Sequence, residues 1–91
     1  MARLTRKAFA AWLAQQDGAP EYACRDPHGC PLARFLGKGS AVHPGNYYVG
    51  FTGLQREMPR WASLYVEAID SQPGPYVGHS TAARILRELP R

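Results

Sequence analysis

One stretch of thirteen residues is the most informative about the fold: C-R-D-P-H-G-C-P-L-A-R-F-L, residues 24–36. Residues 26–29 have the preferences of a type I turn, with Asp first, Pro second and Gly fourth. Pro31 suits the first turn of a helix, where its missing N–H costs nothing, and Gly37 suits the end of that helix. The helix carries three apolar side chains at helical spacing: Leu32, Phe35 and Leu36. The stretch therefore predicts a turn that leads directly into a short helix packed on the core.

The chain has 91 residues, of which 45% are apolar and 20% charged, as in a globular domain. We expect one compact domain over residues 1–91, which buries somewhat more than ~60% of the surface that the unfolded chain exposes. No apolar run approaches the ~18 to 20 residues that span a bilayer, so no membrane partner is expected. Two cysteines are too few for a disulfide-rich secreted scaffold. Polar residues interrupt the N-terminal apolar segment too early for a signal peptide, and we predict a cytoplasmic protein.

Basic side chains outnumber acidic ones by 11 to 7, which gives a net charge of +4. Nine of the eleven basic residues are arginine, whose planar guanidinium group binds carboxylate or phosphate in a bidentate manner. The bias indicates an anionic partner, although a GC-rich coding genome would produce it equally well. The charges are spread along the chain without a run of five or more, which disfavours a nucleic-acid-binding tail.

Three further helices are expected. The first begins after Thr5, whose side chain can cap it, and ends before Gly18. The next starts at Pro59 and has a complete apolar stripe: Trp61, Leu64, Tyr65, Ala68 and Ile69. The last runs from about Thr81, with Ser80 or Thr81 as its cap. Its apolar face consists of Ala82, Ile85, Leu86 and Leu89.

A turn at residues 44–46 separates two short segments with strand character, residues 41–43 and 47–51. They predict a small hairpin or one ordered strand. The fold class that follows is mainly α with a small β-hairpin (α+β), a compact bundle of about four helices.

Four residues of types that bind zinc fall within twenty positions: Cys24, His28, Cys30 and His43. A structural zinc site needs four such nitrogen and sulfur ligands, and a metal would stabilise a small core. Their spacing, C-x3-H-x-C-x12-H, lacks the paired short knuckles of recognised zinc motifs. We therefore expect no metal or other cofactor and treat a zinc-stapled domain as the third hypothesis, after the two described below.

Among enzymatic functions, the sequence offers most support for catalysis by a cysteine nucleophile. Cys30 lies at a predicted helix N-terminus, where a thiolate is stabilised, but Pro31 removes one of the N–H groups that would stabilise it. No residue that would orient a base or form an oxyanion hole can be named. The sequence therefore predicts a protein that is not an enzyme.

Aromatic and basic residues in the second half of the chain form the candidate partner-binding set. Tyrosine and arginine are enriched in interface hot spots, and exposed rings can also stack on single-stranded bases. The set consists of Tyr47, Tyr48, Arg56, Arg60, Arg84 and Arg87. The alternation along the predicted strand implies that either Tyr47 or Tyr48 belongs to the core.

Residues 77–89 resemble the turn and recognition helix of a bacterial helix-turn-helix regulator, in which Ser80, Thr81 and Arg84 would face phosphates and bases. The segment Q-P-G-P at residues 72–75 occupies the place of the first helix of that motif. A DNA-binding regulator that uses the C-terminal helix is therefore the second hypothesis.

Three segments, CPLARFL at residues 30–36, MPRWASLYVEAID at 58–70 and STAARILREL at 80–89, resemble a family of small, largely uncharacterised proteins of bacteria and their phages. The resemblance implies a compact, mainly helical domain and no particular activity. Size, charge and the absence of a catalytic constellation favour an interaction protein that binds a protein or nucleoprotein complex. A phage- or plasmid-borne inhibitor such as an anti-CRISPR protein fits this description, and nucleic acid is the alternative partner.

Overall fold

The computed structural model describes residues 4–16, 21–43, 45–50 and 55–90. Four helices and five short strands lie within these ranges. In chain order they are α1 (Arg6–Ala14), β1 (Tyr22–Ala23), α2 (Pro31–Leu36), β2 (Ala41–His43), β3 (Asn46–Tyr48), β4 (Gln55–Glu57), α3 (Arg60–Asp70), β5 (Tyr76–Val77) and α4 (His79–Glu88). The predicted α+β class with four helices is confirmed. None of the helices described is long and apolar enough to cross a membrane.

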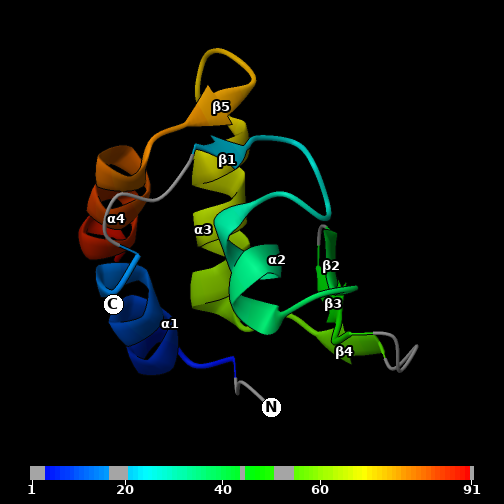
Figure 1. The fold of residues 1–91 in the computed structure, drawn as a ribbon. Coiled ribbons are helices and arrows are strands. Elements are labelled where there is room, and N and C mark those ends of the chain that lie inside the picture. Colours follow the sequence, from blue (N-terminus) through cyan, green and yellow to red (C-terminus); the bar gives the residue numbers. More distant parts are fainter. Residues whose placement is uncertain (1–3, 17–20, 44, 51–54, 91) are drawn as a thin grey trace.

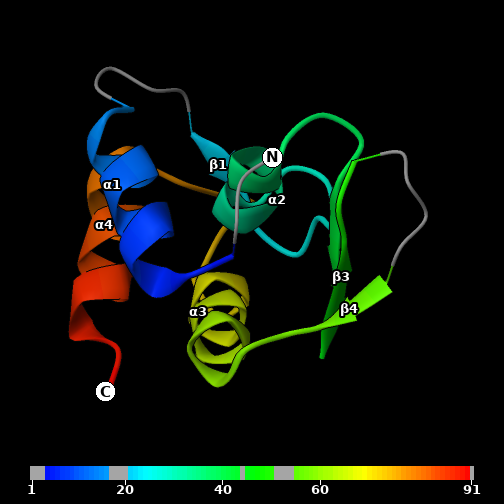
Figure 2. The same ribbon diagram turned by 90° about the horizontal axis from the view of Figure 1, so that it is seen from below.

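The helices and strands are arranged in three layers (Figures 1 and 2). Helices α1 and α4 lie together on one side, α3 and α2 form the middle, and the sheet of β2, β3 and β4 lies on the opposite side. Helix α4 runs back beside α3 in the opposite direction (Figure 1). Any surface on α4 is therefore separated from the sheet by the width of the molecule.

The strands form two antiparallel sheets, where the sequence indicated one hairpin. Strands β2 and β3 make the predicted hairpin, with Val42 opposite Tyr47, and β4 adds a third strand in the order β2-β3-β4. All three residues of β4 are exposed, so no apolar alternation marks this strand in the sequence. Strand β1 pairs with β5, which sets Tyr22 opposite Val77 across more than half of the chain. The predicted strand end at Phe51 lies outside the described residues.

Helices α1 and α2 begin as the sequence predicts. The Thr5 side chain accepts a hydrogen bond from the Ala8 N–H at 3.1 Å, and Pro31 is the first residue of α2. Cys30 is the N-cap of α2, and its Sγ accepts from the Ala33 N–H at 3.4 Å. Gly37 follows the last turn of α2 with φ of 109°, a conformation that favours glycine. The predicted stop of the first helix at Gly18 lies outside the described residues.

Helix α4 begins at His79, two residues earlier than expected, and Gly78 is its N-cap. Strand β5 ends at Val77, so one extended residue joins the strand to the helix. Ser80 and Thr81 consequently lie inside the first turn, and neither side chain caps the helix. The expected cap at Ser80 or Thr81 is therefore wrong, because the pairing of β5 with β1 sets where α4 starts.

The core is centred on Phe9, which has no exposed surface. Its ring lies 5.4 Å from that of Phe35 and 5.1 Å from that of Tyr65, both in edge-to-face geometry. These contacts join α1, α2 and α3. The Tyr65 hydroxyl donates to the Ala82 carbonyl oxygen at 3.0 Å, which connects α3 to α4 inside the core.

Candidate functional site

The four residues considered for zinc have separate structural roles. The thiol of Cys30 caps α2, and Cys24 is buried. The Nδ1 atom of His28 forms a hydrogen bond with the Ser40 carbonyl oxygen at 3.1 Å, and the His43 ring packs edge-on against Tyr48. No group of three or more His, Cys, Asp or Glu side chains within the described ranges could hold a metal ion. The structure therefore does not bring Cys24, His28, Cys30 and His43 together as a zinc site.

The environment of Cys30 opposes nucleophilic chemistry. Burial raises the pKa of its thiol from 9.0 to about 11, and the hydrogen bonds from the Ala33 and Leu32 backbone only partly offset this. A reactive cysteine needs a lowered pKa, because the thiolate is the nucleophile. Cys30 is accordingly a small buried residue that caps a helix.

Of the arginines that the structure describes, three make contacts within the fold. The Arg6 guanidinium donates to the carbonyl oxygens of Leu86, Leu89 and Pro90 at the end of α4. The Arg25 guanidinium donates in the same way to the carbonyl oxygens of Asp70, Gln72 and Gly74 after α3. The Arg34 guanidinium carbon lies 5.3 Å from the centroid of the Tyr22 ring, within cation–π range. Two of these cations satisfy carbonyl groups that helix C-termini leave unpaired.

Four other arginines are exposed: Arg56, Arg60, Arg84 and Arg87. Within the described part of the chain, none of them makes a hydrogen bond, an ion pair or a ring contact. Arg84 and Arg87 lie on the outer face of α4, whereas Arg56 lies on β4, on the opposite side of the molecule (Figures 1 and 2). Arg60 begins α3 and lines a small pocket with Arg6 and Trp61. The arginines of the predicted binding set therefore do not form one surface.

The two tyrosines of that set differ in exposure. Tyr47 is 8% exposed and belongs to the core, whereas Tyr48 is half-buried and its hydroxyl lies 3.4 Å from Gln55 Oε1. The strand alternation correctly predicts that one tyrosine is buried. Since a buried ring cannot contact a partner without local opening, Tyr47 does not serve as an exposed binding residue in this structure.

The connection between α3 and α4 differs from that of a helix-turn-helix motif. In that motif a turn of about three or four residues joins helices that cross at about 90–120°. Here residues 71–78 join the helices, and they include β5. Helix α4 then runs antiparallel to α3 (Figure 1). Helices α3 and α4 thus lack the arrangement of a helix-turn-helix motif. What residues 77–89 share with a recognition helix is a helix with exposed arginines.

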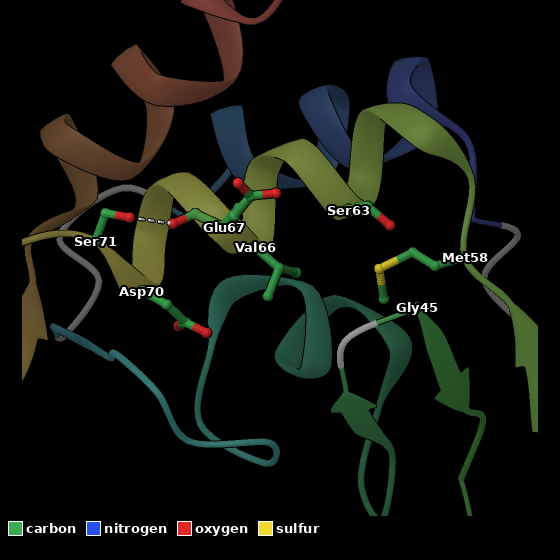
Figure 3. A pocket seen from close by; sticks show the side chains of 7 residues that line it. All are labelled: Gly45, Met58, Ser63, Val66, Glu67, Asp70 and Ser71. Carbon is green, nitrogen blue, oxygen red and sulfur yellow. Dashed lines mark hydrogen bonds between the residues drawn. The ribbon is translucent and has the colours of Figure 1, made fainter.

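A groove lies between α3, the β2–β3 hairpin and the turn that precedes α2. It consists of two adjoining pockets of about 270 and 250 Å³, which share Val66 and Asp70. Figure 3 shows Val66 and Met58 pointing toward the first pocket, with Ser63 and Gly45 beside them. The second pocket is lined by Asp26, Cys30 and His43, among others. The sequence pattern does not predict this groove. The signal that could have indicated it is Val66, an apolar residue that lies outside the predicted apolar stripe of α3 and lines both pockets.

Comparison of the chain with protein-family models, with curated proteins and with solved structures finds no match. The resemblance of residues 30–36, 58–70 and 80–89 to small bacterial and phage proteins therefore stays a prediction.

Proposed function

We propose that this chain is a non-enzymatic interaction protein that binds an anionic surface of a macromolecular partner through α4. One observation carries the proposal. The guanidinium groups of Arg6, Arg25 and Arg34 make intramolecular contacts, whereas those of Arg84 and Arg87, like those of Arg56 and Arg60, have no partner among the described residues. Arg84 and Arg87 are the two of these that lie on one helix. An exposed guanidinium group retains all its donors for a carboxylate or phosphate of a partner.

The outer face of α4 has a geometry suited to such contacts. Ser80, Arg84 and Arg87 are exposed and lie four and three residues apart, so they follow one side of the helix. Glu88 is also exposed, but no ion pair ties it to Arg84 or Arg87. The opposite face of α4 is anchored in the core through Ala82, Ile85 and Leu86. The arginines therefore extend from a helix whose position is set by packing, which favours specific binding.

The partner that this proposal favours is a protein or nucleoprotein complex inside the cell. A small basic domain that covers an acidic or phosphate-rich surface could block access to it. A phage- or plasmid-borne inhibitor such as an anti-CRISPR protein is the form of this function that we propose. The raised pKa of the Cys30 thiol disfavours this residue as a catalytic nucleophile.

Affinity capture from cells of the native host tests the proposal. We compare the wild type with Arg84→Glu/Arg87→Glu and with Lys38→Glu/Arg56→Glu, which changes the net charge equally at exposed positions away from α4. A specific complex retained by the wild type and the control, and lost with the α4 variant, is expected. Recovery of no specific macromolecule, or equal loss with both variants, contradicts the proposal.

Duplex DNA is the second candidate partner, because exposed arginines on one face of a helix also suit phosphates. Binding to DNA would weaken steeply with salt, with a logarithmic slope of about −0.9 per phosphate contacted. We expect capture of the complex to survive deoxyribonuclease treatment. Loss of capture on deoxyribonuclease treatment, together with salt-dependent binding of the purified protein to mixed DNA, would favour the DNA-binding regulator instead.

A further inference from the structure

The groove along α3 is acidic, in contrast with the net positive charge of the chain. Asp70 lines both pockets, Glu67 lines the first and Asp26 lines the second. Among the described residues of the lining the one arginine is Arg25, whose guanidinium group donates to the carbonyl oxygens of Asp70, Gln72 and Gly74. The Arg25 charge offsets part of the carboxylate charge, but Asp26, Glu67 and Asp70 outnumber it, so the lining keeps a net negative charge that favours an external cation.

The two pockets differ in chemistry. Met58 and Val66 give the first pocket an apolar floor, and Figure 3 shows both side chains directed into it. The second pocket is lined by Asp26 and Asp70. Each carboxylate accepts one hydrogen bond from a backbone N–H, Asp26 from His28 and Asp70 from Arg25. A carboxylate has about four acceptor positions, so both retain the capacity to bind an ammonium or guanidinium group.

We propose that this groove binds an extended segment of a partner protein that carries an aliphatic residue and, two positions later, a lysine or arginine. In an extended chain, side chains two residues apart point to the same side and lie about 6.6 Å apart. The pockets adjoin through Val66 and Asp70, so neighbouring side chains on one side of the segment can fill them together. The aliphatic residue lies against Met58 and Val66, and the cation lies against Asp26 and Asp70. Charge complementarity selects this segment over an acidic one.

This groove is separate from the arginine face of α4. The groove lies between α3 and the hairpin, whereas α4 covers the other side of α3 (Figures 1 and 3). A segment bound in the groove would carry a charge opposite in sign to that of a partner bound at α4. Binding in the groove does not depend on the proposed binding through α4.

The probe is the peptide acetyl-Leu-Ala-Lys-Ala-amide, with acetyl-Leu-Ala-Glu-Ala-amide as its control. Binding to the full chain is followed by NMR chemical shifts of backbone amides. We expect the lysine peptide to bind at millimolar concentration and to shift the backbone amides of residues 25, 26, 28–30 and 66–71. The glutamate peptide is expected to leave these amides unchanged. Equal binding of both peptides, or no binding of the lysine peptide, would overturn the proposal.

Two sets of variants assign the binding to the groove. Asp26→Asn/Asp70→Asn keeps the acceptor oxygens for the His28 and Arg25 amides and removes both charges, so the fold is retained. We expect it to weaken binding of the lysine peptide about fivefold or more, the sum of two partly exposed charge contacts. Glu21→Gln/Glu88→Gln, which removes two carboxylate charges at exposed positions outside the groove, is the matched control and leaves the affinity unchanged, as does Arg84→Glu/Arg87→Glu. Unchanged affinity in the Asp26→Asn/Asp70→Asn variant would refute the site.

Discussion

Arg25 and Asp70 are joined by two hydrogen bonds that run between different parts of each residue. The Arg25 backbone N–H donates to Asp70 Oδ1 at 2.8 Å, and the Arg25 guanidinium donates to the Asp70 carbonyl oxygen at the same distance. Arg25 has φ of 59°, a left-handed conformation that is unfavourable for a residue with a Cβ atom. The turn that precedes α2 is thereby attached to the C-terminal end of α3, and the attachment stabilises an otherwise strained residue.

Arg25→Ala should lower the free energy of unfolding by about 1 to 2 kcal/mol, since carbonyl oxygens after α3 lose their charged donor while the left-handed backbone remains. Arg25→Gly should be less destabilised than Arg25→Ala, by roughly 0.5 to 1 kcal/mol, because glycine adopts positive φ without strain. Urea unfolding of the two variants measures the difference. Arg56→Ala removes an arginine that has no partner in the described ranges and is expected to unfold like the wild type. An equal effect of Arg25→Ala and Arg56→Ala on the free energy of unfolding would show that the Arg25 hydrogen bonds do not stabilise the fold.

Arg6 makes an equivalent contact with carbonyl oxygens at the end of α4, across 80 to 84 residues of sequence. Arg6→Ala should destabilise the protein by about 1 kcal/mol and loosen the last turn of α4. Hydrogen exchange of the amides of residues 86–89 should accelerate, while exchange in α3 changes only through global stability. Lys7→Ala alters an exposed neighbour on α1 and serves as the control. Exchange in residues 86–89 that does not respond to loss of Arg6 would argue against the contact.

Two buried tyrosines offer a matched pair for testing core hydrogen bonds. Tyr65 and Tyr22 are both almost fully buried, and the Tyr65 hydroxyl donates to the Ala82 carbonyl oxygen. The Tyr22 hydroxyl has no hydrogen-bond partner among the residues described. Tyr65→Phe should therefore cost about 1 kcal/mol, and Tyr22→Phe should leave stability unchanged or slightly raised. Thermal unfolding followed by circular dichroism compares them. The opposite order would mean that the Tyr65 hydroxyl contributes nothing net.

Alkaline pH should unfold the protein in part through Cys30. The unfolded thiol titrates near 9.0 and the folded thiol near 11, so the unfolded state loses the proton first as pH rises. The stabilisation is complete below pH 9 and is lost between pH 9 and 11, and it amounts to roughly 3 kcal/mol. Burial also raises the pKa of Tyr65, which adds to the loss at higher pH.

Cys30→Ser isolates the thiol contribution, because serine can still cap α2 and does not titrate in this range. The free energy of unfolding of the wild type should fall more steeply between pH 9 and 11 than that of Cys30→Ser. Folded wild-type protein should also react slowly with a thiol reagent at pH 8. Parallel pH profiles for the two proteins would show that Cys30 is not buried as described.

Local sequence signals predicted the elements whose determinants lie within a few residues. Three of these determinants act on neighbouring backbone groups and are found as expected: Thr5 caps α1, Pro31 lies in the first turn of α2 and Gly37 follows the last turn of α2. Strand β4 and the early start of α4 were not anticipated. Both depend on pairing with distant strands, β4 with β3 and β5 with β1. Short exposed strands carry no periodicity that a sequence pattern could reveal.

The candidate sites also depend partly on local sequence and partly on contacts between distant segments. The sequence alone determined the arginine-rich composition, the turn and helix of residues 24–36, and the exposure of one face of α4, because these follow from residue type and helical spacing. Only the tertiary structure decided which arginines are used internally, since Arg6 and Arg25 find their carbonyl partners more than forty residues away. It also created the groove, because Asp26 and Asp70 meet only when the turn before α2 packs against α3. Contacts of this range arise from chain packing, which no local pattern encodes.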